Sequence, residues 1–212
     1  MDNSIMADNI YNETIKPDLM EDALNSSGPV NDHIDVLRYK VFDFAAKEWG
    51  VTRKQLEKVM EKVAYHETGR TMDPKQRQIG GPAGGLYQFE QEPSEKYPKA
   101  SGSATTAETR MINFLTRKDR GLNLPSYYVE SIAKSMPDDF SKIDKRLQDI
   151  AFLTNYLEHP SDESGLSKAA TDDKALKDWY LDIQWAGAPE DRSKRLETFS
   201  GNLESYYRKH GR

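Results

Sequence analysis

The feature that most restricts the fold is a helical spacing of apolar residues along most of the chain. Apolar side chains recur every three or four residues in the stretches 34–45 and 56–64, the period of one face of an α-helix. The same period returns at 105–120, 126–135, 140–157, 172–186 and 190–207. Alternating runs, which are typical of β-strands, are nearly absent. The sequence therefore predicts an all-α fold with little or no β-sheet, apart from a small irregular or hairpin lobe near the glycines at 80–85.

Local signals mark the ends of three of these helices. Gly50 stops the first apolar pattern, and Thr52 can cap the second helix because its hydroxyl can accept a hydrogen bond from a free backbone N–H. Gly69 is expected to end that second helix. A third helix is expected to open at Thr105 or Thr106 and to stop at Gly121.

Residues 1–31 differ in composition from the rest of the chain. They are rich in Asn, Asp and Ser, lack an apolar period, and close on the breaker sequence Ser-Ser-Gly-Pro at 26–29. The first thirty residues hold six acidic residues and one lysine, which accounts for the whole net charge of −5. The sequence predicts a polar acidic arm over 1–31 and one domain over 32–212. Whether the arm is an unstructured tail or orders against a partner protein stays open.

Composition excludes several classes of function. The absence of cysteine excludes disulfides, thiol nucleophiles and Cys-ligated metals. Without a basic surface excess, nucleic-acid-specific binding is not expected. No apolar run is long enough for a transmembrane segment, and the N-terminus has neither the basic head nor the apolar stretch of a secretory signal peptide. His66 and Glu67 begin like a zinc-binding HExxH helix, but Arg70 stands where the second histidine would be. No metal and no cofactor are therefore expected.

The strongest chemical signal is a carboxylate at the end of an apolar stripe. Leu56, Met60, Val63 and Glu67 fall on one face of the predicted second helix, so Glu67 is expected to face the core. Burial and the negative end of the helix dipole would both raise the pKa of this carboxyl, which suits a general acid. The alternative is a last-turn residue that points past the core. The neighbouring His66 is interpreted as a packing residue, with a role in orienting Glu67 as the alternative, and the charged run 192–195 as a solvated face.

A second signal is the glycine density at 80–85. Such a loop lets its backbone approach a ligand or a neighbouring segment closely, although a plain surface turn is the alternative. A phosphate-binding loop is excluded because Leu86 and Tyr87 follow the last glycine, where a Walker loop needs Lys and Ser or Thr.

Taken together, the two signals form a recognisable pattern. A helix ending in Glu67-Thr68, followed after a loop by Gly85-Leu86-Tyr87-Gln88-Phe89, resembles the signature of the soluble lytic transglycosylases and goose-type lysozymes. That signature is Glu-Ser, a variable loop, then Gly-Leu-x-Gln and an apolar residue; here threonine replaces the serine. A third family element, Tyr-Asn-Ala-Gly, has as its counterpart Gln184-Trp185-Ala186-Gly187, which keeps only Ala-Gly. The resemblance spans roughly residues 55–207 and implies a lysozyme-like helical domain with a glycine-rich active-site loop.

The resemblance also implies a mechanism. Glu67 would protonate the oxygen of the β-1,4 bond between MurNAc and GlcNAc, then act as base while the MurNAc 6-hydroxyl attacks its own anomeric carbon, giving a 1,6-anhydro sugar. A second carboxylate from Asp73, Glu90 or Glu92 would instead make the enzyme a hydrolase. The residues expected to contact or orient the glycan are Thr68, Gly84, Gly85, Leu86, Tyr87, Gln88 and Trp185.

Virion-associated transglycosylases of tailed phages are similar, and no signal peptide is expected here. We therefore expect a phage virion protein that opens peptidoglycan in the host periplasm or cell wall, for genome entry or lysis. Its expected partners are glycan strands and, through residues 1–31, other core or tail proteins. The alternative is a structural virion protein that keeps the fold without activity, as the altered Gln184-Trp185 pair suggests.

Overall fold

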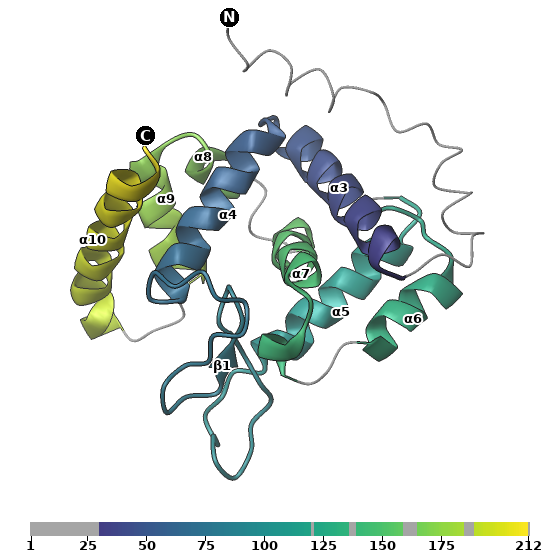
Figure 1. The fold of residues 1–212 in the computed structure, drawn as a ribbon, viewed down its shortest axis with the longest axis horizontal. Helices are drawn as coiled ribbons and strands as arrows, with labels where there is room; N and C mark the ends of the chain where they lie inside the picture. The colour runs from purple at the N-terminus through teal and green to yellow at the C-terminus, as the bar shows by residue number, and fades with distance from the viewer. Residues whose placement is uncertain (1–29, 120, 136–138, 159–164, 185–188, 212) are drawn as a thin grey trace, which may run out of the picture. The chain divides into compact units, whose positions relative to one another are not determined.

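The computed structural model describes residues 30–119, 121–135, 139–158, 165–184 and 189–211. The chain divides into two compact units, residues 1–37 and 38–212, and the second holds the C-terminal part of α3 with every later element. Most of the described chain is helical, so the prediction of an all-α fold with little β-sheet is confirmed (Figure 1). The elements are α3 (Val30–Trp49), α4 (Arg53–Glu67), β1 (Ala83–Gly84), β2 (Phe89–Glu90), α5 (Ser103–Thr116), α6 (Ser126–Ser135), the 3-10 turn η1 (Phe140–Lys142), α7 (Lys145–Leu157), α8 (Gly165–Ala169), α9 (Asp173–Trp179), the π-helical turn η2 (Tyr180–Gln184), the 3-10 turn η3 (Pro189–Asp191) and α10 (Arg192–His210).

The ends of α4 follow the signals in its sequence. The hydroxyl of Thr52 accepts from the backbone N–H of Gln55, whose side chain in turn accepts from the N–H of Thr52, forming a capping box. The helix ends at Glu67, and Gly69 follows with a φ of +56°, a left-handed conformation that glycine adopts without steric cost. The predicted cap and stop of this helix are confirmed.

Four other elements differ from the predicted pattern. The helix expected over 140–157 is interrupted, because Ile143 is extended and Asp144 caps a new helix, α7, by accepting from the N–H of Arg146. The stretch 172–184 changes from α-helix in α9 to the π-helical turn η2. The α5 helix begins at Ser103 after Gly102, rather than at Thr105 or Thr106. The short α8 was not expected. Apolar period alone does not report such interruptions, which depend on capping side chains and tertiary contacts.

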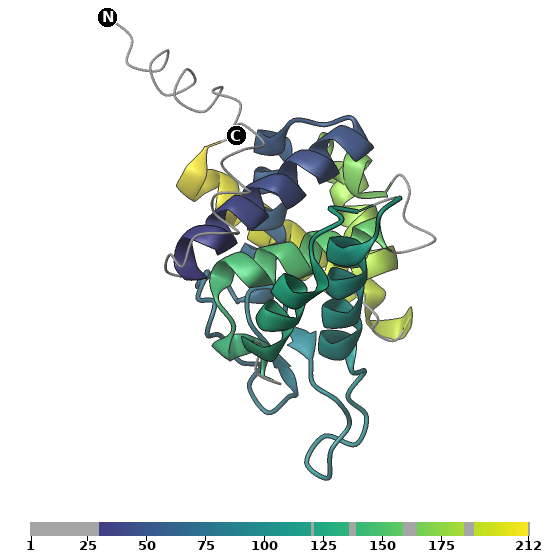
Figure 2. The same cartoon turned by 90° about the vertical axis from the view of Figure 1, so that its right-hand side faces the viewer.

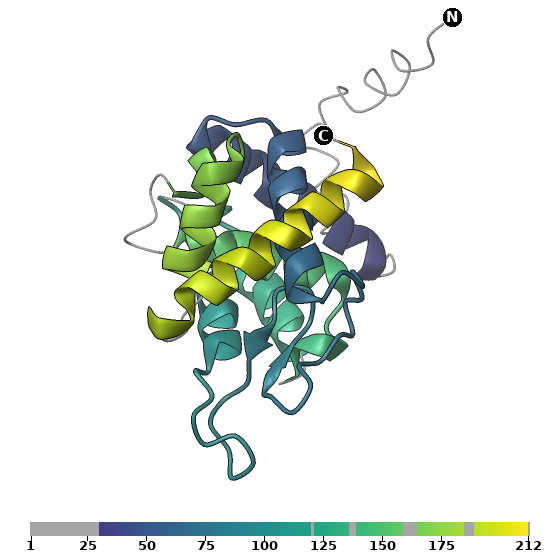
Figure 3. The same ribbon diagram turned by 90° about the vertical axis from the view of Figure 1, so that its left-hand side faces the viewer.

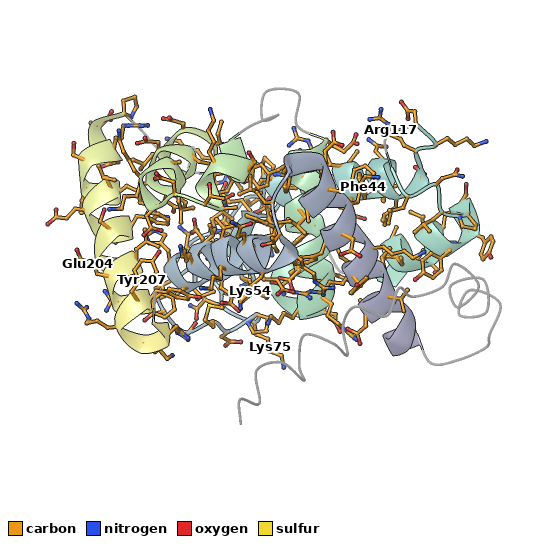
Figure 4. The ribbon with its side chains drawn as sticks, turned by 90° about the horizontal axis from the view of Figure 1, so that it is seen from above. Phe44, Lys54, Lys75, Arg117, Glu204 and Tyr207 are labelled. Carbon is orange, nitrogen blue, oxygen red and sulfur yellow. The ribbon has the colours of Figure 1, made fainter. Side chains whose placement is uncertain are left out.

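Within the second unit, α9 packs against both α8 and α10. The α5 helix contacts both α6 and α7 (Figure 2), and α10 crosses α4 (Figure 3). Seen from above, Tyr207 lies on the side of α10 that faces α4, whereas Glu204 lies on its outer side (Figure 4). Phe44 of α3 meets Phe114 of α5 edge to face, with ring centroids 4.9 Å apart.

A small hairpin follows α4. Strands β1 and β2 pair antiparallel, with Ala83 opposite Glu90 and Gly84 opposite Phe89. The connecting turn contains two left-handed residues, Gly85 at φ +81° and Gln88 at φ +50°. The hairpin therefore presents residues 83–90 beside the C-terminal end of α4.

The expected arm falls almost entirely on residues 1–29, which lie outside the described residues, and the expected boundary at 31/32 falls in the first turn of α3. None of the described helices combines the length and apolar character needed to span a lipid bilayer.

Candidate active site

Glu67 is the last residue of α4 and continues the buried face of that helix. Leu56, Met60 and Val63 on this face are at most 3 % exposed, and the side chain of Glu67 is 10 % exposed. Its carboxyl group lies at the C-terminal end of the helix, where the dipole disfavours a negative charge.

Two side chains from distant parts of the chain bind this carboxyl group. The Tyr180 hydroxyl, at the start of η2, donates to Oε1 of Glu67 over 2.6 Å. Nη2 of Arg195, in the first turn of α10, lies 3.3 Å from Oε2. Arg195 also donates through Nε to the Tyr180 hydroxyl over 3.0 Å, so the three groups form a closed triangle.

The electrostatics of Glu67 combine opposing influences. Burial raises the pKa of the carboxyl, while the Arg195 charge and the hydrogen bonds from Tyr180 and Arg195 lower it; burial is the largest effect, and the pKa lies above its usual value. Burial, together with the neighbouring carboxylate, also raises the pKa of Tyr180, so the tyrosine stays a hydrogen-bond donor at neutral pH.

His66 lies behind this triangle and packs rather than binding the carboxyl. Its ring meets Tyr180 and Phe199 edge to face, with centroids 4.9 and 4.8 Å away. Burial lowers the pKa of His66 to about 3, with a smaller contribution from Arg195. Arg70 donates to Oδ1 of Asn202, so the Asn202 amide nitrogen faces Nδ1 of His66 at 2.9 Å and the ring proton sits on Nε2. Within the described part of the chain, that buried nitrogen has no partner.

Glu67 lies in the wall of a cavity of about 710 Å³. The walls come from α4, the hairpin, α5, α7, η2 and α10, which converge from across the sequence. The lining residues are Glu67, Gln78, Ala83, Tyr87, Gln88, Phe89, Glu90, Lys99, Ser101, Ser103, Thr106, Arg110, Asn155, Tyr156, Ile183, Gln184 and Arg195.

Of the residues at 84–88 that were expected to contact the glycan, Tyr87 and Gln88 line this cavity. Tyr87 is largely a core residue: its ring stacks on Phe152 at 4.1 Å, and its hydroxyl donates to Asp149 over 2.7 Å. The side-chain nitrogen of Gln88 donates to the Gly85 carbonyl over 2.7 Å, which fixes the amide at the cavity wall.

Gly84, Gly85 and Leu86 lie behind the cavity wall and are not among its lining residues. A Cβ added to Gly85 would lie 2.6 Å from Oε1 of Gln148, and the Leu86 N–H donates to the same oxygen over 2.7 Å. A Cβ on Gly84 would lie 3.2 Å from that of Ser141. The close approach that these glycines permit is therefore to α7 and η1.

Thr68 is buried and holds the turn after α4. Its hydroxyl donates to the Ala64 carbonyl over 2.7 Å and accepts from the N–H of Met72 over 2.9 Å. This hydroxyl is bound to backbone groups rather than to the Glu67 carboxyl. It orients Glu67 only through the end of the helix.

Of the acids considered as a second carboxylate, Glu90 lines the cavity, where it accepts from the N–H of Ser101 over 2.7 Å. Asp73 instead accepts from the N–H of Lys75 in the turn after α4, and the carboxylate of Glu92 lies against Gly102.

Trp185 lies outside the described residues. Its neighbour Gln184 lines the cavity, accepts from the Tyr156 hydroxyl and donates to the carbonyl of Tyr87 over 3.4 Å. Gln184 therefore reaches the cavity from the segment that was compared with the Tyr-Asn-Ala-Gly element.

Sequence reasoning missed Tyr180 and Arg195. The expectation of a solvated face at 192–195 is wrong for Arg195, which is 31 % exposed and points at Glu67. A signal was present, because Arg195 precedes the buried Phe199 by four residues and so continues the apolar stripe of α10.

Comparison of the chain with protein-family models, with curated proteins and with solved structures gives no significant match. Among the residues that the structure describes, no group of three or more histidine and acidic side chains is arranged to hold a metal ion.

Proposed function

We propose that this protein is a lytic transglycosylase that cleaves the β-1,4 bond between MurNAc and GlcNAc in peptidoglycan, with Glu67 as its general acid and base. The observation that carries the proposal is the Glu67 carboxyl, buried in the wall of a cavity with its pKa raised by burial. A carboxyl that stays protonated nearer neutral pH can donate to a leaving oxygen. The motif resemblance supplies the substrate class.

In the proposed reaction, protonated Glu67 gives its proton to the glycosidic oxygen, and the bond from this oxygen to C1 of MurNAc breaks. The C6 hydroxyl oxygen then bonds to C1 while its proton passes to the Glu67 carboxylate. The carboxyl is restored, no water is consumed, and the product carries a 1,6-anhydro ring. The cavity volume of about 710 Å³ lies within the range of small-ligand sites. The Gln88 amide in its wall offers polar atoms to a sugar.

The proposed setting is a phage virion, in which the enzyme opens the cell wall locally during genome entry and residues 1–31 dock onto core or tail proteins. The runner-up is a structural virion protein without activity. The observation that favours the runner-up is the binding of Glu67 by Arg195 and Tyr180, which occupies both carboxyl oxygens.

The test is mass spectrometry of muropeptides released from purified peptidoglycan. The wild type is expected to release products that end in anhydro-MurNAc, and Glu67→Gln is expected to release none, because an amide cannot donate and regain the proton. The matched control is Glu130→Gln on the exposed face of α6, which should cleave like the wild type.

Two other results would redirect the proposal. Reducing-end MurNAc carrying ¹⁸O from labelled water, lost in Glu90→Gln, would mean a hydrolase with Glu90 as its second carboxylate. Release of nothing by a folded wild type would favour the structural virion protein.

A further inference from the structure

The Arg195 charge beside Glu67 raises a chemical question. A cation close to a carboxyl stabilises the ionised form and so opposes a group that acts only as an acid. A single carboxyl that first loses and then regains a proton has a different need, because its charged form must persist between the two transfers without leaving its position. The surroundings of Glu67 match this second need.

The two carboxyl oxygens are held by a chain of donors. The Tyr180 hydroxyl has one proton, which it gives to Oε1 of Glu67 over 2.6 Å, and it accepts from Arg195 in return. A tyrosine that accepts from a guanidinium is polarised into a stronger donor. Arg195 therefore acts on Oε1 through the tyrosine and on Oε2 directly at 3.3 Å.

The donors themselves are fixed by packing. The Tyr180 ring stacks on Phe199, with centroids 4.2 Å and planes 6° apart, and it meets the His66 ring edge to face at 4.9 Å. Arg195 and Phe199 are one turn apart on α10, so one helix face carries both the guanidinium and the ring that orients the tyrosine.

Other charged groups near the cavity do not share this role. Of the described residues that face Glu67 or line the same cavity, Arg195 and Tyr180 are the two that hydrogen-bond its carboxyl. The remaining titratable groups there are His66 on α4, Tyr87 and Glu90 on the hairpin, Lys99 before α5, Arg110 on α5 and Tyr156 on α7.

We propose that Arg195 is a positioning residue, which acts directly and through Tyr180 to hold the Glu67 carboxylate toward the cavity and to stabilise it between its two proton transfers. The catalytic part of this inference rests on the proposed function. The electrostatic part concerns Glu67 alone and can be measured in an inactive protein.

The experiment is a ¹³C NMR titration of the Glu67 side-chain carboxyl in the full-length protein, paired with the pH dependence of kcat on purified peptidoglycan. In Arg195→Gln the pKa of Glu67 is expected to rise by about 1 to 3 units, since a neighbouring arginine lowers a carboxyl pKa by about that amount. Arg195→Lys keeps the charge, so the pKa of Glu67 should stay close to its wild-type value. Tyr180→Phe removes one hydrogen bond and should raise the pKa by less.

The kinetic readout separates positioning from simple structural support. Cleavage requires protonated Glu67 first, so the fall of kcat at high pH should move upward in Arg195→Gln by the same interval as the titration. At lower pH, kcat should fall at least tenfold with KM little changed, because the carboxylate loses its support. The matched control is Arg192→Gln, one turn earlier on α10, whose arginine pairs with Asp182 at 2.6 Å and does not touch Glu67.

The outcomes distinguish the two proposals. An unchanged Glu67 pKa in both Arg195→Gln and Tyr180→Phe, or an equal shift in Arg192→Gln, would overturn the role of Arg195. If the wild type cleaves nothing while the titration shifts as expected, the proposed function fails and the electrostatic assignment of Arg195 stands.

Discussion

Burial acts on His66 and Glu67 in the same sense although one is a base and the other an acid. In each case the charged form is disfavoured, so the pKa of His66 falls to about 3 and that of Glu67 rises. The histidine stays neutral against the ring of Tyr180, and that ring holds the hydroxyl bound to Glu67. At the scale of single residues, a neutral histidine thus packs against the tyrosine that binds Glu67.

This arrangement predicts an acid-sensitive fold. In the unfolded chain His66 is protonated below about pH 6.5, whereas in the folded chain it is protonated only below about pH 3. The contribution of neutral His66 to the free energy of unfolding is therefore fully present above pH 6.5. It is lost as the pH falls toward 3, by up to about 1.4 kcal/mol per pH unit. Denaturant unfolding of wild type and His66→Phe between pH 7 and 4 should show a shallower loss in the variant.

The control for this measurement is His210→Phe at the exposed end of α10, which should keep the slope of the wild type. Parallel slopes for wild type and His66→Phe would show that His66 does not set the acid sensitivity. The slope is the readout, because loss of the bond to Asn202 changes stability equally at every pH in the window.

At the scale of elements, α7 fixes the hairpin turn that carries Tyr87 and Gln88. Two neighbouring residues of α7 bind two neighbouring residues of the turn. Gln148 accepts from the N–H of Leu86, and Asp149 accepts from the Tyr87 hydroxyl. Arg38 of α3 pairs with the other oxygen of Asp149 at 2.8 Å. The turn is therefore held from behind by buried polar bonds, which are costly to leave unmade.

We expect Gln148→Leu to lower the free energy of unfolding by about 3 kcal/mol, because it leaves the buried Leu86 N–H and the Ile143 carbonyl without their partner. The proposed glycan cleavage should fall as well, since Gln88 would lose its fixed position. Equilibrium denaturation compared with Lys145→Leu, on the exposed first turn of α7, measures the effect. A loss no larger than that of Lys145→Leu would contradict this role of Gln148.

At the scale of the whole molecule, the candidate site is a product of long-range packing. Its principal residues, Glu67, Tyr87, Gln88, Tyr180 and Arg195, come from four separate elements. All described lining residues fall between Glu67 and Arg195 in the sequence.

A chain shortened to begin at Val30 is therefore expected to keep the thermal unfolding temperature of the full chain and the proposed Glu67-dependent cleavage. Incorporation into virions should fall, because the arm is proposed to dock there. Calorimetry, muropeptide release and particle composition would measure the three effects. A large drop in the unfolding temperature would mean that the arm belongs to the folded core.

The sequence by itself determined the helical class, the cap and stop of α4, and the place of Glu67 at the end of a buried stripe. These features depend on local spacing and on capping groups within a few residues, which a sequence displays directly. It also singled out Tyr87 and Gln88, through a motif.

Only the tertiary structure decided what surrounds Glu67. From the sequence, the glycines at 84 and 85 could face either a ligand or a neighbouring helix. In the structure they lie against Ser141 and Gln148, which belong to η1 and α7. Tyr180 and Arg195 lie more than a hundred residues from Glu67, and no local pattern encodes that meeting. These residues meet because α10 packs across α4. Arg195, which the sequence predicts to be solvated, thereby supplies the charge beside Glu67.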